Sequence, residues 1–340
     1  MKNKLWMRKI KVTLTSMIPY ENGKYGVMVF GDDTTDPKFI TSEVKLENPS
    51  ITINGKKTAA SLQDNGVVVI TNLSYSTIAK MTLYKFFLIK IEIGYQDNNF
   101  VEIFNGEVSY ISQKIYSKHD TETYITYASH LVAAYSQNRI NFTANSGINL
   151  YTCIQQISML TGLPAENVSE ELKKITLTMD ENYSGSASSL IEKIMSENKS
   201  FTLSTDGTNG TVIDITTVKD KRVIVIDNKN IPIGSGNPTL SSGGVDITLI
   251  PTCNFKVGDI LKLDNAMLNI AISSPENVGS TFNQNYLDKN GLYMIYYIEY
   301  TFQNRGDQFQ YNVKARALDV IQSMTGGIWL WVILTILIRY

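Results

Sequence analysis

The chain has 340 residues, with 31 lysines and arginines against 32 aspartates and glutamates, and 43% of its residues are hydrophobic. This length is typical of two or three globular domains. The near-zero net charge argues against a protein that coats nucleic acid, because neutralising phosphates takes a surplus of basic residues. Cys153 and Cys253, the two cysteines, are too few for a disulfide scaffold or a zinc cluster.

The N-terminus is basic but has the pattern of a strand. In MKNKLWMRKIKVTLTSM there is no apolar run of signal-peptide length, and Ile10, Val12 and Leu14 alternate with polar residues. We therefore expect no secretory signal, and synthesis in a reducing cytoplasm.

Strand-like stretches dominate the first part of the chain. They are rich in β-branched and aromatic residues: YGVMVFG (25–31), GVVVI (66–70), FFLIKIEI (86–93), FVEIFNGEVSYI (100–111) and TYITYAS (123–129). Turn-forming pairs, among them Asn54-Gly55, Asn65-Gly66 and Asn105-Gly106, are expected to punctuate these strands. The pattern predicts a closed or nearly closed β-barrel domain over residues 1–145.

The hydrophobic period then changes to that of a helix. Residues Leu150, Cys153, Ile154, Ile157 and Leu160 recur at helical spacing, which makes Cys153 a buried packing thiol. We expect Ser146 to cap this helix, and Ser184 or Ser186 to cap a second helix at 187–195. Two strands joined by a turn at 206–210 complete a small α+β domain, residues 146–218.

Strands return after Lys219. The segments RVIVID, GVDITLIP, DILKLD, LNIAIS, GLYMIYYIEYTF and FQYNVKARALDV predict a second β-barrel domain over residues 219–325. A polar stretch, 273–291, has the composition of a long loop. The expected fold is therefore mainly β, with two barrels flanking the small α+β domain and an apolar C-terminal tail at 326–340.

Catalytic patterns are sparse. His119 and His130 are the two histidines, and neither is accompanied by a nucleophile-elbow motif. Glu181 and Glu192 could be a glycosidase pair on residue type alone. The sequence predicts a protein that is not an enzyme, with no catalytic residues.

Cofactor and metal motifs give the same result. The GSG at 234–236 lacks the lysine of a phosphate-binding loop, so a turn is the better interpretation. Asp32, Asp33 and Asp36 lack the spacing of a calcium loop and favour a solvated turn. We expect no cofactor and no metal site.

One segment, IDNKNIPIGSGNPTLSSGGVDITLIPTCNFKVGDILKLDN (226–265), has a more specific pattern. A glycine-proline loop precedes a glycine-valine strand, a leucine/proline bend and a glycine turn into another strand. The residues that carry the pattern are Gly234, Pro238, Gly244, Val245, Leu249, Pro251 and Gly258. This order resembles the second barrel of the two-barrel baseplate hub proteins of tailed bacteriophages.

Other segments are similar to the same family. The stretch 290–316 resembles its closing hairpin, in which a strand starting at Gly291 and Tyr293 pairs with the one ending at Arg316. A short helix near Thr77–Leu83 and the strands IEIGY (91–95) and VEIFNGEVSYI (101–111) resemble the first barrel. The similarity covers about residues 10–320 as a series of loose motifs.

The resemblance implies a structural protein of the virion tail baseplate, synthesised in the host cytoplasm. Three copies would form a ring that joins a sixfold tail tube to a threefold central spike and lets DNA pass. It implies contacts with a tail tube or distal tail protein, the central spike and the tape-measure protein. Two alternatives stay open: the hub of a bacterial contractile injection system, and a membrane-anchored β-rich enzyme or adhesin.

The chain ends in GGIWLWVILTILIRY (326–340), which the family pattern does not include. Its apolar run is much shorter than the roughly 20 residues that span a bilayer. We expect the run to dock on the other copies or on an axial partner, with contact to a host membrane as the second possibility. The expected docking residues are Ile328, Trp329, Leu330, Trp331, Val332, Ile333 and Leu334.

Overall fold

A computed structural model of the chain describes most of its residues. The described ranges are 8–19, 23–31, 49–59, 64–95, 100–115, 120–129, 139–161, 170–197, 201–206, 209–214, 221–227, 229–231, 237–241, 244–269 and 287–318. The apolar tail 326–340 and most of the strand expected at LNIAIS (268–273) lie outside these ranges.

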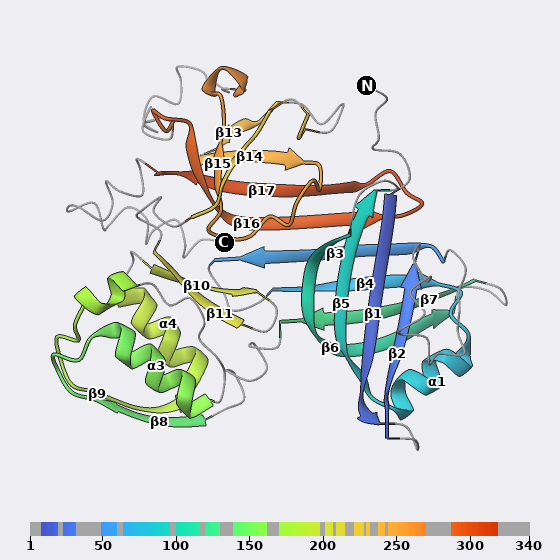
Figure 1. The fold of residues 1–340 in the computed structure, drawn as a ribbon, viewed down its shortest axis with the longest axis horizontal. Helices are drawn as coiled ribbons and strands as arrows, with labels where there is room; N and C mark the ends of the chain where they lie inside the picture. Colours follow the sequence, from blue (N-terminus) through green and yellow to red (C-terminus); the bar gives the residue numbers. More distant parts are fainter. Residues whose placement is uncertain are drawn as a thin grey trace, which may run out of the picture.

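One large sheet dominates the molecule (Figure 1). The first part of the chain contributes β1 (Arg8–Pro19), β2 (Tyr25–Gly31), β3 (Ile51–Thr58), β4 (Asn65–Thr71), β5 (Phe86–Tyr95), β6 (Val101–Ile115) and β7 (Thr121–Ala128). The last part contributes β12 (Val223–Val225), β13 (Thr239–Ser241), β14 (Gly244–Leu249), β15 (Ile260–Lys262), β16 (Leu292–Gln303) and β17 (Phe309–Ala317). The mainly β class that the sequence predicts is therefore confirmed.

The two β-rich parts of the chain share this sheet. Its strand order is β13-β14-β17-β16-β3-β4-β7-β6-β5-β1-β2; β15 pairs with β16, and β12 pairs with β15 in parallel. The link between the parts is β3, which pairs with β16 from Thr58 opposite Tyr297 to Thr52 opposite Gln303. Among the described strands this sheet branches at β16 and does not close on itself, so two separate barrels remain a prediction.

Three turns expected from Asn-Gly pairs are wrong. Asn54-Gly55 lies in the middle of β3, Asn65-Gly66 begins β4, and Asn105-Gly106 lies within β6. The physical reason is packing: a Cβ on Gly55 would overlap the Tyr300 ring, and one on Gly66 would overlap Tyr127. These glycines provide room for aromatic rings in the sheet rather than backbone freedom for a turn.

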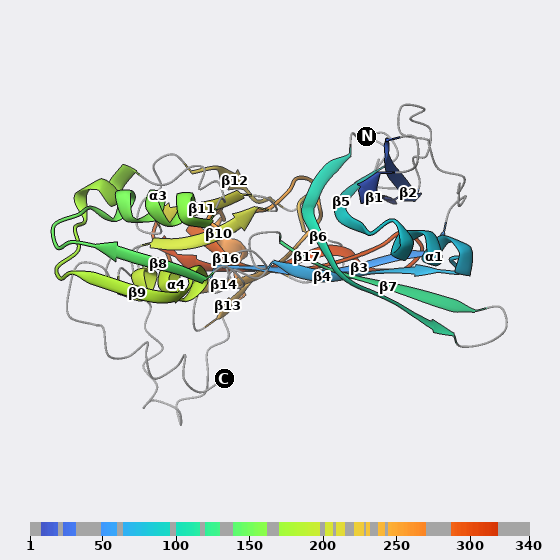
Figure 2. The same ribbon diagram turned by 90° about the horizontal axis from the view of Figure 1, so that it is seen from below.

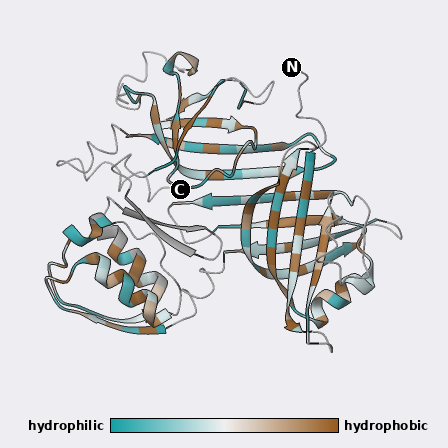
Figure 3. Cartoon of the chain, viewed as in Figure 1, coloured by the Kyte–Doolittle hydropathy of each residue, from teal (hydrophilic) through white to brown (hydrophobic). Residues whose placement is uncertain are grey.

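The main hydrophobic core also spans both parts of the chain. Figure 3 shows the alternation of hydrophobic and hydrophilic residues along the strands that one buried face requires. The core cluster runs from Ile10 in β1 through Ile53 in β3 to Val313 in β17. Helix α1 (Tyr75–Leu83) closes one end by burying Thr77 and Met81, and Ser74 caps it by accepting a hydrogen bond from the Thr77 N–H.

The small α+β part has its own core. It contains β8 (Arg139–Ala144), α3 (Leu150–Thr161), the 3₁₀ turn η2 (Glu170–Lys174), β9 (Glu181–Ser186) and α4 (Ala187–Glu197), followed by the hairpin β10 (Phe201–Asp206) and β11 (Asn209–Asp214). Strand β8 pairs with β9, and Ile140 and Phe142 pack with the helices. Since β8 precedes residue 145, the exact domain division stays a prediction.

Local predictions in this part are mostly correct. Cys153 is fully buried, as expected, and burial raises the pKa of its thiol. Ser186 accepts from the Ser189 N–H, so it caps α4. Ser146 does not cap α3, because the Asn149 side chain accepts from the Thr152 N–H at 2.8 Å instead.

The C-terminal hairpin agrees with the family pattern. Strand β16 pairs with β17 along its length, with Tyr293 opposite Ala317 and Met294 opposite Arg316. A second 3₁₀ turn, η3 (Asn265–Met267), precedes it. Within the described ranges, no helix has both the length and the apolar character to cross a bilayer.

Candidate functional site

Most candidate residues from the sequence fall outside the described ranges. These are His119, His130, Asp32, Asp33, Asp36, the GSG at 234–236 and the tail residues 328–334. Glu181 is described: both of its carboxylate oxygens accept from Lys193 Nζ at 2.7 Å, so it forms an ion pair. Among the described residues, no three potential ligands gather where a metal ion could bind.

The structure instead draws attention to the junction between β3 and β16. Tyr127 in β7 and Tyr300 in β16 are fully buried, and their hydroxyl groups are 2.9 Å apart. Burial raises the pKa of both phenols well above 10, so they are neutral hydrogen-bonding partners. This buried hydrogen bond joins residues 173 positions apart and connects the two β-rich parts within the core.

Side-chain hydrogen bonds connect the two β-rich parts at both ends of β3. The Asn304 side chain accepts from the Ile51 N–H at 2.9 Å and donates to the Pro49 carbonyl at 2.8 Å. At the other end of β3, the buried Lys57 donates to Asn254 Oδ1 at 3.1 Å. Buried polar groups that are paired in this way fix the register of the strands they connect.

The side of the sheet opposite this core is polar, and we call it the junction face. Figure 2 shows β1 and β2 on one side of β3, β4 and β7; the junction face is on the other side. On most strands its residues alternate with buried ones, and those of β6 belong to it by their pairing with β7. The junction face consists of Thr52, Asn54, Lys56, Asn65, Val67, Val69, Ser112, Lys114, Glu122, Tyr124, Thr126, Asp246, Thr248, Glu299, Thr301, Gln310, Asn312 and Lys314.

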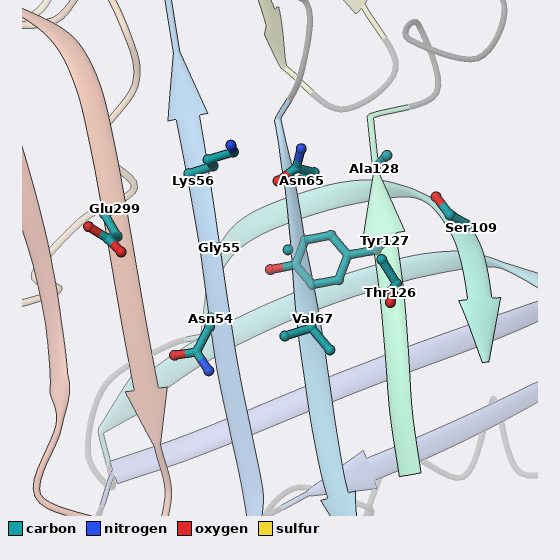
Figure 4. A pocket seen from close by; sticks show the side chains of 11 residues that line it. Asn54, Gly55, Lys56, Asn65, Val67, Ser109, Thr126, Tyr127, Ala128 and Glu299 are labelled. Atoms are coloured by element: carbon teal, nitrogen blue, oxygen red, sulfur yellow. The ribbon is translucent and has the colours of Figure 1, made fainter. Parts of the chain in front are cut away.

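An open depression of about 600 Å³ lies in the middle of this face. Figure 4 shows the side chains around it, which come from β16, β3, β4, β7 and β6. Asn54, Asn65, Ser109 and Thr126 supply neutral hydrogen-bonding groups. Gly55 and Gly66 lie opposite one another in the floor of the depression, and on the inner side of the sheet the rings of Tyr300 and Tyr127 occupy the space beside them.

Charges on the junction face are balanced in pairs across neighbouring strands. Opposite residues in the register are Asp246 and Lys314, Glu299 and Lys56, and Glu122 and Lys114. Each pair brings a carboxylate beside an ammonium group, which cancels the net charge locally. The face thus offers many neutral and paired polar groups and no basic surplus.

The sequence of β3 has the alternation of a half-buried strand, but the turn expected at Asn54-Gly55 conflicts with it. Residues 51–58 (ITINGKKT) begin with apolar and polar residues in alternation, as a half-buried strand does. The Asn54-Gly55 pair suggested a break, because only the distant Tyr300 explains the glycine. Sequence alone could not bring β3 beside β16, since some 240 residues separate them.

No known family profile matches the sequence, and no curated protein does either. Solved structures do match its fold. The 43 kDa tail protein of prophage MuSo2 from Shewanella oneidensis aligns over 92% of this chain and 99% of its own, with a TM-score of 0.54 and 7% identity. A chain of the half-lidded Francisella PdpA–VgrG complex aligns over 93% of this chain and 59% of its own length, with a TM-score of 0.51 and 12% identity.

The resemblance to phage tail proteins is therefore confirmed at the level of fold. The match spans both β-rich parts and the small α+β part together, rather than one of them. At these identities the likeness concerns the backbone arrangement and assigns no residue a role.

Proposed function

We propose that this chain is a structural hub protein of a tailed-phage baseplate, which assembles as a homotrimeric ring between tail tube and central spike. The observation that carries the proposal is the whole-chain fold likeness to the MuSo2 tail protein. Each chain would contribute its two β-rich parts, so that three copies place six similar units around one axis. Such a ring can match sixfold symmetry on one side and threefold symmetry on the other.

The junction face suits the lumen of that ring. A DNA-binding surface gains affinity by neutralising phosphates with lysine and arginine, which releases counterions. On this face the named basic residues have acidic residues opposite them, as Lys56 has Glu299 and Lys314 has Asp246. DNA would therefore pass without being held, and a catalytic role is not part of the proposal.

The apolar tail completes the proposal. Three copies of Ile328–Leu334 would converge near the ring axis and pack on each other, on the tape-measure protein or on the spike. Such a run has to be buried, because its apolar side chains would otherwise form a large exposed patch. Deletion of residues 326–340 should leave a folded, soluble ring that fails to recruit its axial partner. If tails assembled and retained DNA without these residues, and only delivery at the host membrane were lost, the membrane role would replace this one.

The hub of a bacterial contractile injection system is the second candidate, and the likeness to the PdpA–VgrG complex favours it. The two candidates predict the same ring. They differ in cargo: complete virions with this ring release DNA through it, whereas an injection device carries no genome.

The mass of the native protein tests the ring directly. A trimer of a 38.1 kDa chain has three times that mass, about 114 kDa, by light scattering. A monomer at micromolar concentration with the tail intact would contradict the proposal. Clearing of a peptidoglycan zymogram that point changes at acidic residues abolish would contradict a purely structural role.

A further inference from the structure

An apolar surface lies at one end of the first β-rich part, and we call it the apolar tip. Its members come from the end of β1, the start of β2, the end of α1 and the start of β5: Met17, Ile18, Tyr25, Leu83, Phe87 and Leu88. Each of these side chains is between 38% and 68% exposed. Single exposed apolar residues are ordinary, but six neighbours of this size are not.

Hydrogen bonds and strand pairing show that the segments carrying these residues lie side by side. The Met17 N–H donates to the Lys85 carbonyl at 2.9 Å, and the Ile18 N–H donates to the Tyr84 carbonyl at 3.4 Å. On the other side of β1, Tyr25 lies opposite Pro19. The end of β1 therefore lies between β2 and the turn that joins α1 to β5.

A β-bulge creates the centre of the tip. Thr15 is opposite Leu88 and Ser16 is opposite Phe86, so Phe87 is an extra residue in β5. An extra residue interrupts the alternation of sides, and as a result Phe87 and Leu88 are both exposed. Regular pairing would have turned one of them inward, so the bulge adds apolar surface that the fold of this domain does not use.

The size of the tip fits an interface. Six large side chains of roughly 150–200 Å² each, about half exposed, present on the order of 500 Å². That is most of the roughly 800 Å² that one partner contributes to a standard protein interface. The surface also points away from the rest of the chain, because the opposite end of β1 contacts the second β-rich part through Arg8 and Gly306 (Figure 1).

Lysines border the tip. Among the described residues of this margin, Lys24 precedes Tyr25, Lys85 follows the end of α1 and Lys80 lies one turn before Leu83, while Glu107, opposite Leu88, is acidic. A second copy meeting tip to tip would bring these lysines against one another, which like-charge repulsion disfavours. A partner with carboxylates around an apolar centre would complement them.

We propose that the apolar tip is the docking surface for a different protein, whose contacting surface is apolar and bordered by carboxylates. The inference rests on the proposed function in one respect, which is that the partner is a neighbour in the assembled tail. It adds the surface and the chemistry by which that neighbour is recognised. Phe87 and Leu88 form the buried centre of the contact, and Lys85 pairs with a carboxylate of the partner at its rim.

Zero-length carbodiimide crosslinking of isolated intact tails tests this inference, because it joins lysine amines to carboxylates in direct contact. We expect mass spectrometry to find Lys24 or Lys85 linked to an aspartate or glutamate of a chain with a different sequence. Links from these lysines to this chain's own carboxylates alone, or no links at all while Lys56 and Lys314 react, would overturn the inference.

A pair of variants tests the apolar centre. Phe87→Ser with Leu88→Ser should reduce the yield of complete tails at least tenfold in complementation, while the purified protein keeps its native mass and melting temperature. Tyr75→Ser is the matched control, since Tyr75 is 80% exposed at the other end of α1. Equal yields for both variants would overturn the inference.

Two further measurements separate the possible explanations. Flotation with vesicles containing phosphatidylserine should show no binding; binding that the double variant abolishes would assign the tip to a lipid surface instead. A 114 kDa trimer whose tip lysines lack foreign crosslinks would overturn this inference alone. A monomer whose tip lysines are linked to a foreign chain would overturn the ring alone.

Discussion

At the residue scale, the junction depends on glycines that leave space for tyrosine rings. Gly55 lies under Tyr300 and Gly66 under Tyr127, and the two phenols then meet at 2.9 Å. Sequence reasoning can find Cys153 on its helix, because helical spacing is local. It cannot find the function of these glycines, because each ring comes from a strand elsewhere in the chain.

The first prediction concerns these two glycines. Gly55→Ala and Gly66→Ala should each lower the free energy of unfolding by about 1–3 kcal/mol, because the added methyl group has to displace a buried ring. Urea denaturation measures this. Asn54→Ala, at the exposed neighbour of Gly55, is the control and should change the free energy by less than about 0.5 kcal/mol. Equal effects at Gly55 and Asn54 would show that the rings do not need this space.

The buried phenols predict a loss of stability at alkaline pH. Tyr127, Tyr300 and Tyr311 have pKa values raised well above 10 by burial. Below pH 10 these tyrosines are protonated in both states and contribute nothing to the pH dependence. Above pH 10 the unfolded chain loses protons that the folded chain retains, so the free energy of unfolding falls, by up to about 1.4 kcal/mol per pH unit for each tyrosine.

Denaturation curves between pH 8 and pH 11.5 check this prediction. The triple variant with phenylalanine at these three positions is the control, and its curve should be flatter above pH 10. A wild-type curve as flat as that of the variant would contradict the assignment of raised pKa values.

At the element scale, β3 is the strand on which the architecture depends. It pairs with β4 on one edge and with β16 on the other, and so joins the two β-rich parts. Hydrophobic periodicity predicts strands such as β2, β5 and β7 closely, because alternation is a property of each strand alone. The same periodicity does not predict which strands pair with one another, because pairing depends on strand edges brought together from distant parts of the chain.

Asn304 should contribute strongly to the stability of the connection between β3 and β16. Asn304→Ala removes both side-chain hydrogen bonds to the chain around β3 and leaves the Ile51 N–H without this acceptor. We expect a loss of about 1–3 kcal/mol in the free energy of unfolding. Asp307→Ala, in the exposed turn of the same hairpin, should have almost no effect. Similar losses for the two variants would mean that the Asn304 hydrogen bonds contribute little to the free energy of unfolding.

At the scale of the whole molecule, the sequence predicts the class and the order of parts, and the fold likeness to a tail protein agrees. The separation into two barrels was drawn from similar strand patterns on either side of the small α+β part. In the structure these parts share one sheet and one core cluster, and their division into two barrels stays a prediction. A continuous sheet also explains how one polar face can extend across both parts.

We propose that three copies form a ring whose lumen is lined by the junction face. Cryo-electron microscopy of isolated tails tests it most directly. We expect three copies of this chain between tail tube and spike, with Asn54, Lys56 and Glu299 directed toward the axis. A map in which these residues contact the outer surface of another protein, or in which the chain occurs once or six times in the ring, would contradict it.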